Sequence, residues 1–432
     1  MAAKITDELQ LACGQTLPNR LAKAAMTEGL ADQHNGATDR LVKLYERWAA
    51  GGLGLLLTGN IQIDRRHLER AGNVVIDGPV SLEQMGALKK WTSSAKSKGA
   101  RVWAQLSHAG RQTPKAINPT PLAPSAVQLG LPGRQFGEPK AMSGDEVHDV
   151  ITRFAHAASV CRDAGFDGIQ IHAAHGYLLS EFLSPRANLR TDEWGGSLEN
   201  RARLLLDTIK AARKATAPDF AISVKLNSAD FQKGGFTNEE CLKVVSWLNN
   251  AGIDLLEISG GNYEQPKMAG LEGIEPSSEE KVRESTRQRE AYFIDYASTI
   301  SKVARMPLMV TGGFRSRDGM QDALDIGACQ VIGIGRPLCG DPIAGKRLLS
   351  GEARSLPTYE KKLRVGPGWL GPNSPLSVIK MINGWGAQGW YCLQLIRMGD
   401  GQEPDLHMGV LQASQRYAKN ETAGAKALIR SA

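Results

Sequence analysis

The chain alternates short apolar segments with amphipathic ones, and this alternation restricts its fold more than any other feature. The apolar segments are rich in Val, Ile and Leu without polar alternation, which is typical of parallel strands covered on both faces. We predict strands at residues 20–26, 53–58, 102–106, 168–172, 221–226, 255–259, 307–311 and 331–335. We predict helices at residues 38–50, 81–98, 145–164, 198–215, 238–250, 290–304, 317–325 and 342–349.

Eight such strand–helix units predict an α/β fold, the closed (β/α)8 or TIM barrel. An open doubly wound sheet is the alternative, but no G-x-G-x-x-G turn follows the first strand. We assign residues 1–352 to the barrel, with a hairpin turning at Gly14 and Gln15 before its first strand. Residues 353–432 fall outside the alternation and form a C-terminal extension with a final helix at 405–430. We expect the extension to pack on the barrel or form a subunit contact.

Composition narrows the class of protein. An apolar content of 42% and a charged content of 22% are ordinary for a globular chain. The net charge is +7, but Lys and Arg are scattered among acids, so no nucleic-acid partner is expected. The six cysteines form no C-x-x-C pair, which suggests free thiols in a reducing compartment. Without an apolar run of about 18 residues or a signal core, we expect a cytoplasmic protein with no membrane partner.

Glycines follow the last two predicted strands. In a TIM barrel, function gathers where strands end, and the loops after strands seven and eight frequently bind phosphate. Gly312 and Gly313 follow strand seven, while Gly335 and Arg336 follow strand eight. Glycine lets backbone N–H groups approach a phosphate, and arginine adds a charged contact. The sequence therefore predicts a phosphorylated ligand, although Gly312 and Gly313 can also form an ordinary turn.

Two histidines and a tyrosine lie where the fourth predicted strand ends. His172 and His175 are three residues apart, so they reach one ligand only if the chain leaves the strand between them. Two neutral imidazoles can then stabilise a developing oxyanion, and Tyr177 can deliver a proton. Structural packing of the histidines is one alternative. A zinc site is another, but Asp230 or Glu257 supplies a third ligand only if the barrel brings it close.

Several motifs, in the same order along the chain, resemble those of the Old Yellow Enzyme family of flavin-dependent NAD(P)H oxidoreductases, often called ene-reductases. The longest spans residues 172–201 and contains H-A-A-H-G-Y and R-T-D-E-W-G-G-S-L-E-N-R. Others lie at residues 19–27, 104–111 and 333–337. The resemblance covers residues 15–350.

The resemblance implies a non-covalent FMN in the mouth of the barrel. It assigns to the flavin Ala24, Met26, Thr27, Gly59, Gln105, Lys225, Gly313, Gly335 and Arg336. Ala24, Met26 and Thr27 line the isoalloxazine. Gly59 backs the ring, and Gln105 hydrogen-bonds its pyrimidine part. Gly313, Gly335 and Arg336 bind the phosphate. By the same pattern His172 and His175 hold a substrate carbonyl, and Tyr177 is the proton donor.

Three positions depart from the family pattern. Lys225 stands where the family usually has Arg near flavin N1 and O2, so the positive charge is kept without a planar fork. Thr27 stands where one bacterial branch has Cys, and Gly29 where that branch has Tyr. No cysteine cluster follows strand eight, so we expect FMN without an iron–sulfur cluster and no metal.

We therefore expect NADH or NADPH to reduce FMN, which then reduces the activated C=C bond of an α,β-unsaturated carbonyl compound. Oxygen or a quinone as acceptor, as in an NADH oxidase, is the alternative enzyme. A flavin-free barrel that only binds ligands and a metal-dependent hydrolase are further alternatives. Arg283, Arg287 and Arg289 can meet a nucleotide phosphate or form a solvated face. The choice between NADH and NADPH and the formation of a homo-oligomer stay open.

Overall fold

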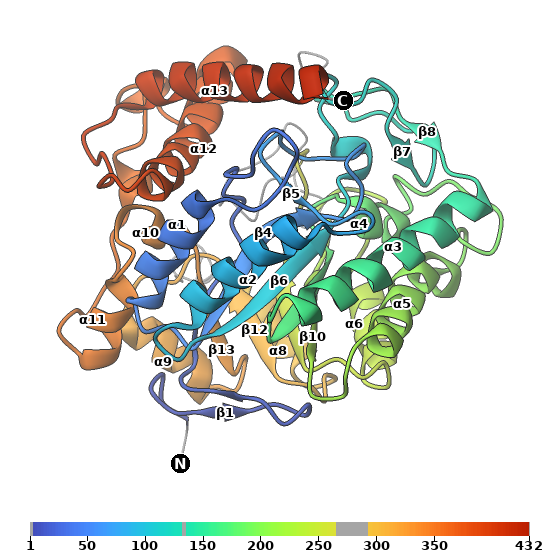
Figure 1. The fold of residues 1–432 in the computed structure, drawn as a ribbon, viewed down its shortest axis with the longest axis horizontal. Helices are drawn as coiled ribbons and strands as arrows, with labels where there is room; N and C mark the ends of the chain where they lie inside the picture. The colour runs from blue at the N-terminus through green and yellow to red at the C-terminus, as the bar shows by residue number, and fades with distance from the viewer. Residues whose placement is uncertain (1–2, 132–134, 265–292, 432) are drawn as a thin grey trace.

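The computed structural model describes residues 3–131, 135–264 and 293–431. Within these ranges, eight parallel strands pair side by side, and the ring closes because the first pairs with both the second and the last (Figure 1). They are β3 (Leu21–Lys23), β4 (Leu55–Gln62), β6 (Arg101–Ser107), β9 (Gly168–Ala173), β10 (Ala221–Asn227), β11 (Leu255–Ser259), β12 (Leu308–Thr311) and β13 (Val331–Ile334). The predicted TIM barrel is confirmed.

Helices surround this ring (Figure 1). They are α1 (Asp39–Ala49), α2 (Leu82–Lys96), α3 (Gly144–Asp163), α5 (Leu198–Ala215), α6 (Asn238–Leu248), α8 (Ile294–Ile300), α9 (Arg317–Asp325) and α11 (Ala344–Ser350). Several begin where a hydroxyl accepts a hydrogen bond from a backbone N–H three residues on, a local signal for a helix start. These caps are Ser81, Ser143, Ser197, Thr237 and Ser316. The start of the predicted helix at 290–304 lies outside the described residues.

The amino-terminal end of the barrel is closed by apolar side chains. The hairpin of β1 (Leu9–Gln10) and β2 (Thr16–Leu17) turns near Gly14, whose φ is 88°, as predicted. Its leucines join an inner cluster with residues from the strands, namely Leu55, Trp103, Leu255, Met309 and Val331. Apolar packing therefore fills this end of the barrel, and polar side chains are left for the opposite end.

The first barrel strand is shorter than predicted, because β3 stops at Lys23 rather than at residue 26. The Ala24 N–H still bonds the Ile334 carbonyl of β13 at 2.8 Å, after which the chain leaves the barrel wall. Short elements that were not predicted also occur at the carboxyl ends of strands. They are β5 (Val74–Val75), β7 (Leu122–Ala123), β8 (Lys140–Ala141), α4 (Leu178–Leu183) and α10 (Pro337–Gly340).

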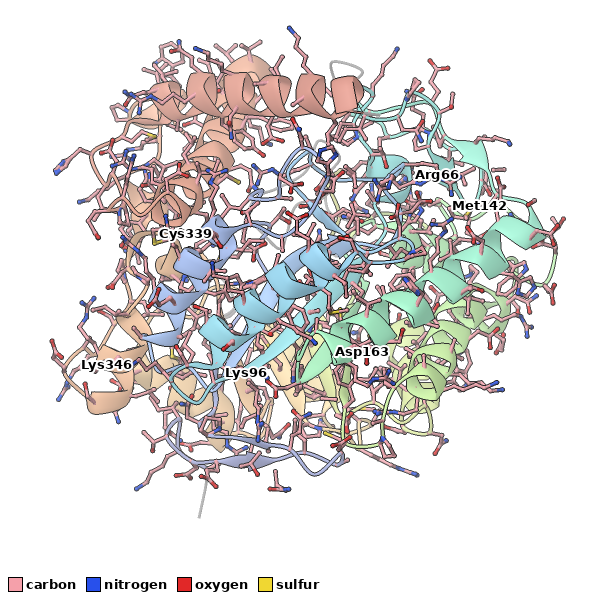
Figure 2. The ribbon with its side chains drawn as sticks, in the orientation of Figure 1. Arg66, Lys96, Met142, Asp163, Cys339 and Lys346 are labelled. Carbon is pink, nitrogen blue, oxygen red and sulfur yellow. The ribbon has the colours of Figure 1, made fainter. Side chains whose placement is uncertain are left out.

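The C-terminal extension forms two long helices, α12 (Ser377–Gly399) and α13 (Val410–Ser431), that contact each other, while α12 also contacts α1 (Figure 1). The predicted final helix at 405–430 corresponds to α13. Helix α10, which carries the Cys339 labelled in Figure 2, contacts α12, and its Leu338 carbonyl accepts a bond from the α1 indole Trp48 at 3.1 Å. Among the described helices, none combines the length and apolar character that a membrane crossing requires.

Helix α12 was not predicted, because its glycines suggested a loop. Two of them instead allow close helix packing. A Cβ on Gly386 would lie 2.6 Å from the Val410 carbonyl oxygen, and one on Gly389 would lie 2.7 Å from the Tyr417 Cβ. At these positions glycine allows α12 to pack closely against α13 and does not form a turn.

Candidate active site

A layer of polar side chains lines the barrel at the carboxyl ends of its strands. His172 of β9 is in register with Lys225 of β10, which is in register with Glu257 of β11. Partners in register on neighbouring strands share a face. The adjacent strand residues Ile171 and Val224 pack outward in the strand–helix core, so the polar set points inward. Lys225 Nζ lies 3.0 Å from Glu257 Oε1, a buried ion pair at the centre of the layer.

Two glutamine side chains, Gln170 and Gln105, extend this polar layer inside the barrel. Gln170 lies two residues before His172 and therefore on the same face of β9. Its Nε2 donates to Glu257 Oε2 at 2.8 Å, and its Oε1 accepts from Gln105 Nε2 at 2.6 Å. The structure thus links Gln105 to Lys225 through two buried side chains.

The chain leaves β9 between the two histidines, which is the condition for both to reach one ligand. The strand ends at Ala173, and His175 has a φ of 62°, a left-handed conformation that is uncommon outside glycine. Its backbone N–H bonds Asn227 Oδ1 at 3.1 Å, and its Nε2 lies 2.7 Å from Ser259 Oγ. The ring centre of His175 consequently lies 5.1 Å from that of His172.

Both imidazoles are neutral. Burial, together with the nearby Lys225, lowers the pKa of His172 and of His175 well below the usual range. His172 Nδ1 accepts the backbone N–H of Ala174 at 3.2 Å, so its proton resides on Nε2. His172 is therefore a fixed neutral donor.

Tyr177 completes the predicted group. Its ring centre lies 4.8 Å from that of His172, and its hydroxyl donates to Glu69 Oε2. The hydroxyl of Tyr263 lies 2.7 Å from the same phenol oxygen. Burial and the nearby Glu69 raise the pKa of Tyr177 well above its usual value, so the phenol keeps its proton at neutral pH.

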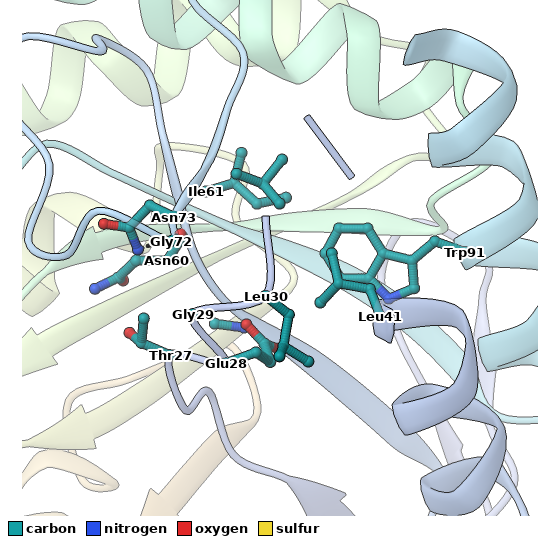
Figure 3. Close-up of a pocket in the computed structure, with 12 residues that line it drawn as sticks. Thr27, Glu28, Gly29, Leu30, Leu41, Asn60, Ile61, Gly72, Asn73 and Trp91 are labelled. Atoms are coloured by element: carbon teal, nitrogen blue, oxygen red, sulfur yellow. Dashed lines mark hydrogen bonds between the residues drawn. The ribbon is translucent and has the colours of Figure 1, made fainter. Parts of the chain in front are cut away.

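The residues assigned to the flavin ring lie on two adjoining segments. Met26 and Thr27 follow β3, and a Cβ on Gly59 of β4 would lie 2.5 Å from the Met26 carbonyl oxygen and 2.6 Å from Thr27 Cα. The Gly59 N–H donates to Glu28 Oε1 at 2.9 Å, which fixes this close approach. Behind Thr27 lies a cavity of about 10 Å³, the space of one water molecule, bordered by Asn60 and other residues (Figure 3).

The predicted phosphate loops lie next to each other, because β12 and β13 are neighbours in the ring. Gly312 and Gly313 have φ values of 121° and 87°, conformations that glycine adopts readily. Gly335 and Arg336 follow β13, and a Cβ on Gly335 would lie 3.5 Å from Met26 Sδ. This end of the site therefore adjoins the segment that follows β3.

The inner wall between β4 and β6 carries polar atoms that suit a flavin. Ile61 packs in the outer core, so its neighbours Asn60 and Gln62 face inward. In the described part of the chain, Asn60 Oδ1, both amide atoms of Gln62 and Ser107 Oγ are buried without a hydrogen-bond partner. Buried polar atoms normally have partners. The N–H and carbonyl edge of an isoalloxazine can supply them, so the residues present fit FMN.

The zinc alternative at the histidine pair has little support. Glu257 already binds Lys225 and Gln170, and Asp230 accepts bonds from Asn227 Nδ2 at 3.2 Å and the Phe236 N–H at 3.0 Å. Both candidate third ligands are therefore engaged.

A separate group, Asp64, His67 and His108, has ligand atoms within 4.8 Å of one another. There His67 Nε2 accepts the Leu122 N–H at 2.9 Å, so its proton sits on Nδ1, 3.2 Å from Asp64 Oδ2. A protonated nitrogen cannot bind a metal. The hydrogen bonds thus favour an Asp–His pair at this place.

Sequence reasoning missed the segment after β4. Glu69 contacts Tyr177, and its neighbour Arg70 donates to the Thr27 carbonyl at 3.2 Å. The available signal was a charged run, residues 64–70, directly after a strand end, where barrel function gathers. Arg283, Arg287 and Arg289 lie outside the described residues.

Comparison with known proteins shows which enzyme family this chain is similar to. A family model described as NADH:flavin oxidoreductase / NADH oxidase matches residues 9–354. The NADH-dependent flavin oxidoreductase iliE of Hypocrea jecorina is 36% identical over 357 residues, covering 79% of this chain and 88% of the relative. The NADH-dependent flavin oxidoreductase nadA of Aspergillus parasiticus is 37% identical over 350 residues, covering 78% and 76%. The solved Old Yellow Enzyme homologue from Zymomonas mobilis has a TM-score of 0.68 and 25% identity, covering 82% of this chain and 95% of that one.

Proposed function

Because the chain belongs to the NADH:flavin oxidoreductase / NADH oxidase family, with the barrel of the Old Yellow Enzymes, we propose that it reduces the activated C=C bond of α,β-unsaturated carbonyl compounds. Its cofactor is FMN, and NADH or NADPH is the hydride donor. FMN, when held in the barrel, would supply hydride transfer between the nicotinamide and the acceptor. The protein supplies binding, orientation and electrostatics.

The observation that supports this function best is the histidine pair. His172 is buried, His175 is partly buried, and both are neutral, with 5.1 Å between their ring centres. If both imidazoles donate to the oxygen of an enone carbonyl, they stabilise the negative charge that develops there as the β-carbon accepts hydride. Because the His172 tautomer is fixed by the Ala174 N–H, its Nε2 proton points away from the backbone and is available to the acceptor.

We propose that Tyr177 then gives a proton to the α-carbon. Its phenol is protonated at neutral pH and lies beside His172. A positioned acid of this kind typically accelerates proton transfer by about 10²–10⁴-fold.

We assign the cofactor contacts from the family pattern and their position in the barrel. The set comprises Ala24, Met26, Thr27, Gly59, Gln105, Lys225, Gly313, Gly335 and Arg336. Gly59 and Thr27 pack tightly together as a wall for the ring, and Gln105 offers amide groups from inside the barrel. Lys225 supplies positive charge beside His172, at the position for which the family resemblance implies Arg.

We further propose residues 1–352 as the catalytic barrel and residues 353–432 as an extension that packs on it. Helices α12 and α13 reach the barrel through α1 and through the loop that carries Arg70. The six cysteines are unpaired in the structure, which supports our proposal of a reducing, cytoplasmic location. We expect small molecules, the enone and the nicotinamide, as its partners.

An anaerobic titration tests this function. The purified protein is first reduced with NADH or NADPH and then mixed with 2-cyclohexen-1-one, while the flavin absorbance is followed. We expect rapid reoxidation by the enone. Reoxidation by oxygen or a quinone but not by the enone would support an oxidase instead, and the absence of a flavin band would support a flavin-free barrel.

A further inference from the structure

We propose that Glu69 is a positioning residue that holds the phenol of Tyr177 and returns a proton to it after each turnover. This inference rests on the proposed function, because it concerns the step in which Tyr177 protonates the reduced substrate. Glu69 lies on the loop after β4, which sequence reasoning had left without a role.

The contacts place Glu69 at the end of a chain of hydroxyl groups. Glu69 Oε2 accepts the Tyr177 hydroxyl and also the Nδ2 of Asn60. On its other side, the oxygen of Tyr177 lies 2.7 Å from the hydroxyl of Tyr263. Tyr177 is buried, whereas Glu69 is only partly buried, so the carboxylate links the phenol to solvent.

The direction of these hydrogen bonds follows from the number of protons. A phenol has one proton. When Glu69 is ionised, Tyr177 directs that proton at Oε2, and the Tyr263 hydroxyl must donate to the Tyr177 oxygen. In this arrangement the Tyr177 proton points at Glu69 and is unavailable to a substrate.

A proton on Glu69 reverses the arrangement. The carboxyl O–H then donates to the Tyr177 oxygen, and the phenol proton is free to turn toward the substrate. As the α-carbon forms its new C–H bond with the electron pair of the enolate, the Tyr177 O–H bond breaks and leaves its pair on oxygen. The Glu69 O–H bond then breaks to restore the phenol, and the carboxylate takes up a hydronium proton from the solvent, which releases water.

The loop that carries Glu69 is held firmly enough for this role. The Arg70 N–H donates to Asn73 Oδ1 at 2.9 Å. Asn35 Nδ2 donates to the carbonyl oxygens of Ala71 and Asn73, each at 2.9 Å. Preorganised hydrogen bonds of this kind fix a side chain in its working position.

The test compares Glu69→Gln with wild type in single turnovers. Glutamine keeps the shape but has no acidic proton to return. We expect flavin reduction by the nicotinamide to be unchanged and reoxidation by 2-cyclohexen-1-one to slow by about 10–100-fold, within the range of acid catalysis. The solvent deuterium isotope effect on reoxidation should rise, because proton delivery becomes limiting. Glu83→Gln on the exposed side of α2 is the matched control and should change nothing.

A double-variant cycle separates proton return from a structural role. In a Tyr177→Phe background, Glu69→Gln should have no further effect, because its partner is gone. An equal slowing in both backgrounds, or no slowing in the wild-type background, would overturn the inference. If Glu69→Gln fails to fold, Glu69→Asp, with its carboxylate withdrawn from Tyr177, takes its place in the same cycle. Failure of the wild type itself to reduce the enone would instead overturn the proposed function.

Discussion

Arg70 and Glu421 are 351 positions apart in the chain, yet guanidinium Nη2 lies 2.6 Å from carboxylate Oε1. Arg70 stands on the loop after β4 and Glu421 on helix α13, so the pair joins the barrel to the extension. The same guanidinium donates to the Thr27 carbonyl and lies 5.1 Å from the ring centre of Tyr417. The extension therefore contacts a residue that holds the proposed flavin-binding segment.

Glu421→Ala should weaken both the fold and the cofactor site. It leaves the buried Arg70 charge without its acidic partner, and we expect a loss of about 1–3 kcal/mol in the free energy of unfolding. Flavin fluorescence titration should show weaker FMN binding, because Thr27 loses support. Glu403→Ala is the control, since Glu403 pairs with Arg47 while 84% exposed and should cost less than about 1 kcal/mol. Equal effects of the two variants would show that the extension does not support the site.

Gly59→Ala should disturb the wall behind the flavin. The added methyl would approach the Met26 carbonyl and Thr27 Cα, which are backbone atoms that cannot turn away. We expect a loss of about 1–3 kcal/mol by denaturant unfolding and reduced FMN content. Gly86→Ala in α2 meets nothing within 4 Å and should stabilise the chain by about 0.5–1 kcal/mol. If the Gly59→Ala protein keeps its full FMN content, Gly59 is not part of the wall behind the flavin.

Lys225→Met should leave Glu257 buried without its cation. Breaking one partner of such a pair typically costs about 3–5 kcal/mol. The double variant Lys225→Met with Glu257→Gln should recover much of this loss, because neither charge then remains. Urea unfolding of the single and double variants measures the coupling, and additive losses would contradict a direct pair.

Glu181→Gln should change how stability depends on pH. Burial raises the pKa of Glu181 to about 8, and its Oε2 lacks a hydrogen-bond partner. Above the unfolded value of about 4.3 the unfolded chain has released this proton while the folded chain keeps it, so the wild type loses stability as pH rises toward 8. The free energy of unfolding of the variant should therefore rise relative to that of the wild type by up to about 1.4 kcal/mol per pH unit across this window. A difference in unfolding free energy between the two proteins that stays constant from pH 5 to 8 would contradict the raised pKa of Glu181.

The barrel could be predicted because its strands are buried on both faces and its helices begin at recognisable caps. The condition for a shared ligand also followed from the sequence, since two histidines three apart can reach one ligand only if the chain turns off the strand, and His175 does lie on such a turn. Helix α12 could not be predicted, because glycine at 386 and 389 serves contacts with a helix still to come. The roles of Glu69 and Arg70 depend on partners 108 and 351 positions away, which local patterns do not encode.

The rate of flavin reoxidation in His172→Ala and His175→Ala tests the central claim most directly. Each protein, reduced with NADH or NADPH under anaerobic conditions, is mixed with 2-cyclohexen-1-one in a stopped-flow spectrometer. We predict that both variants keep FMN and are reduced normally, while reoxidation by the enone slows by about 10²–10³-fold, the usual cost of losing one oxyanion donor. Reoxidation at the wild-type rate would contradict the claim that this histidine pair activates the acceptor.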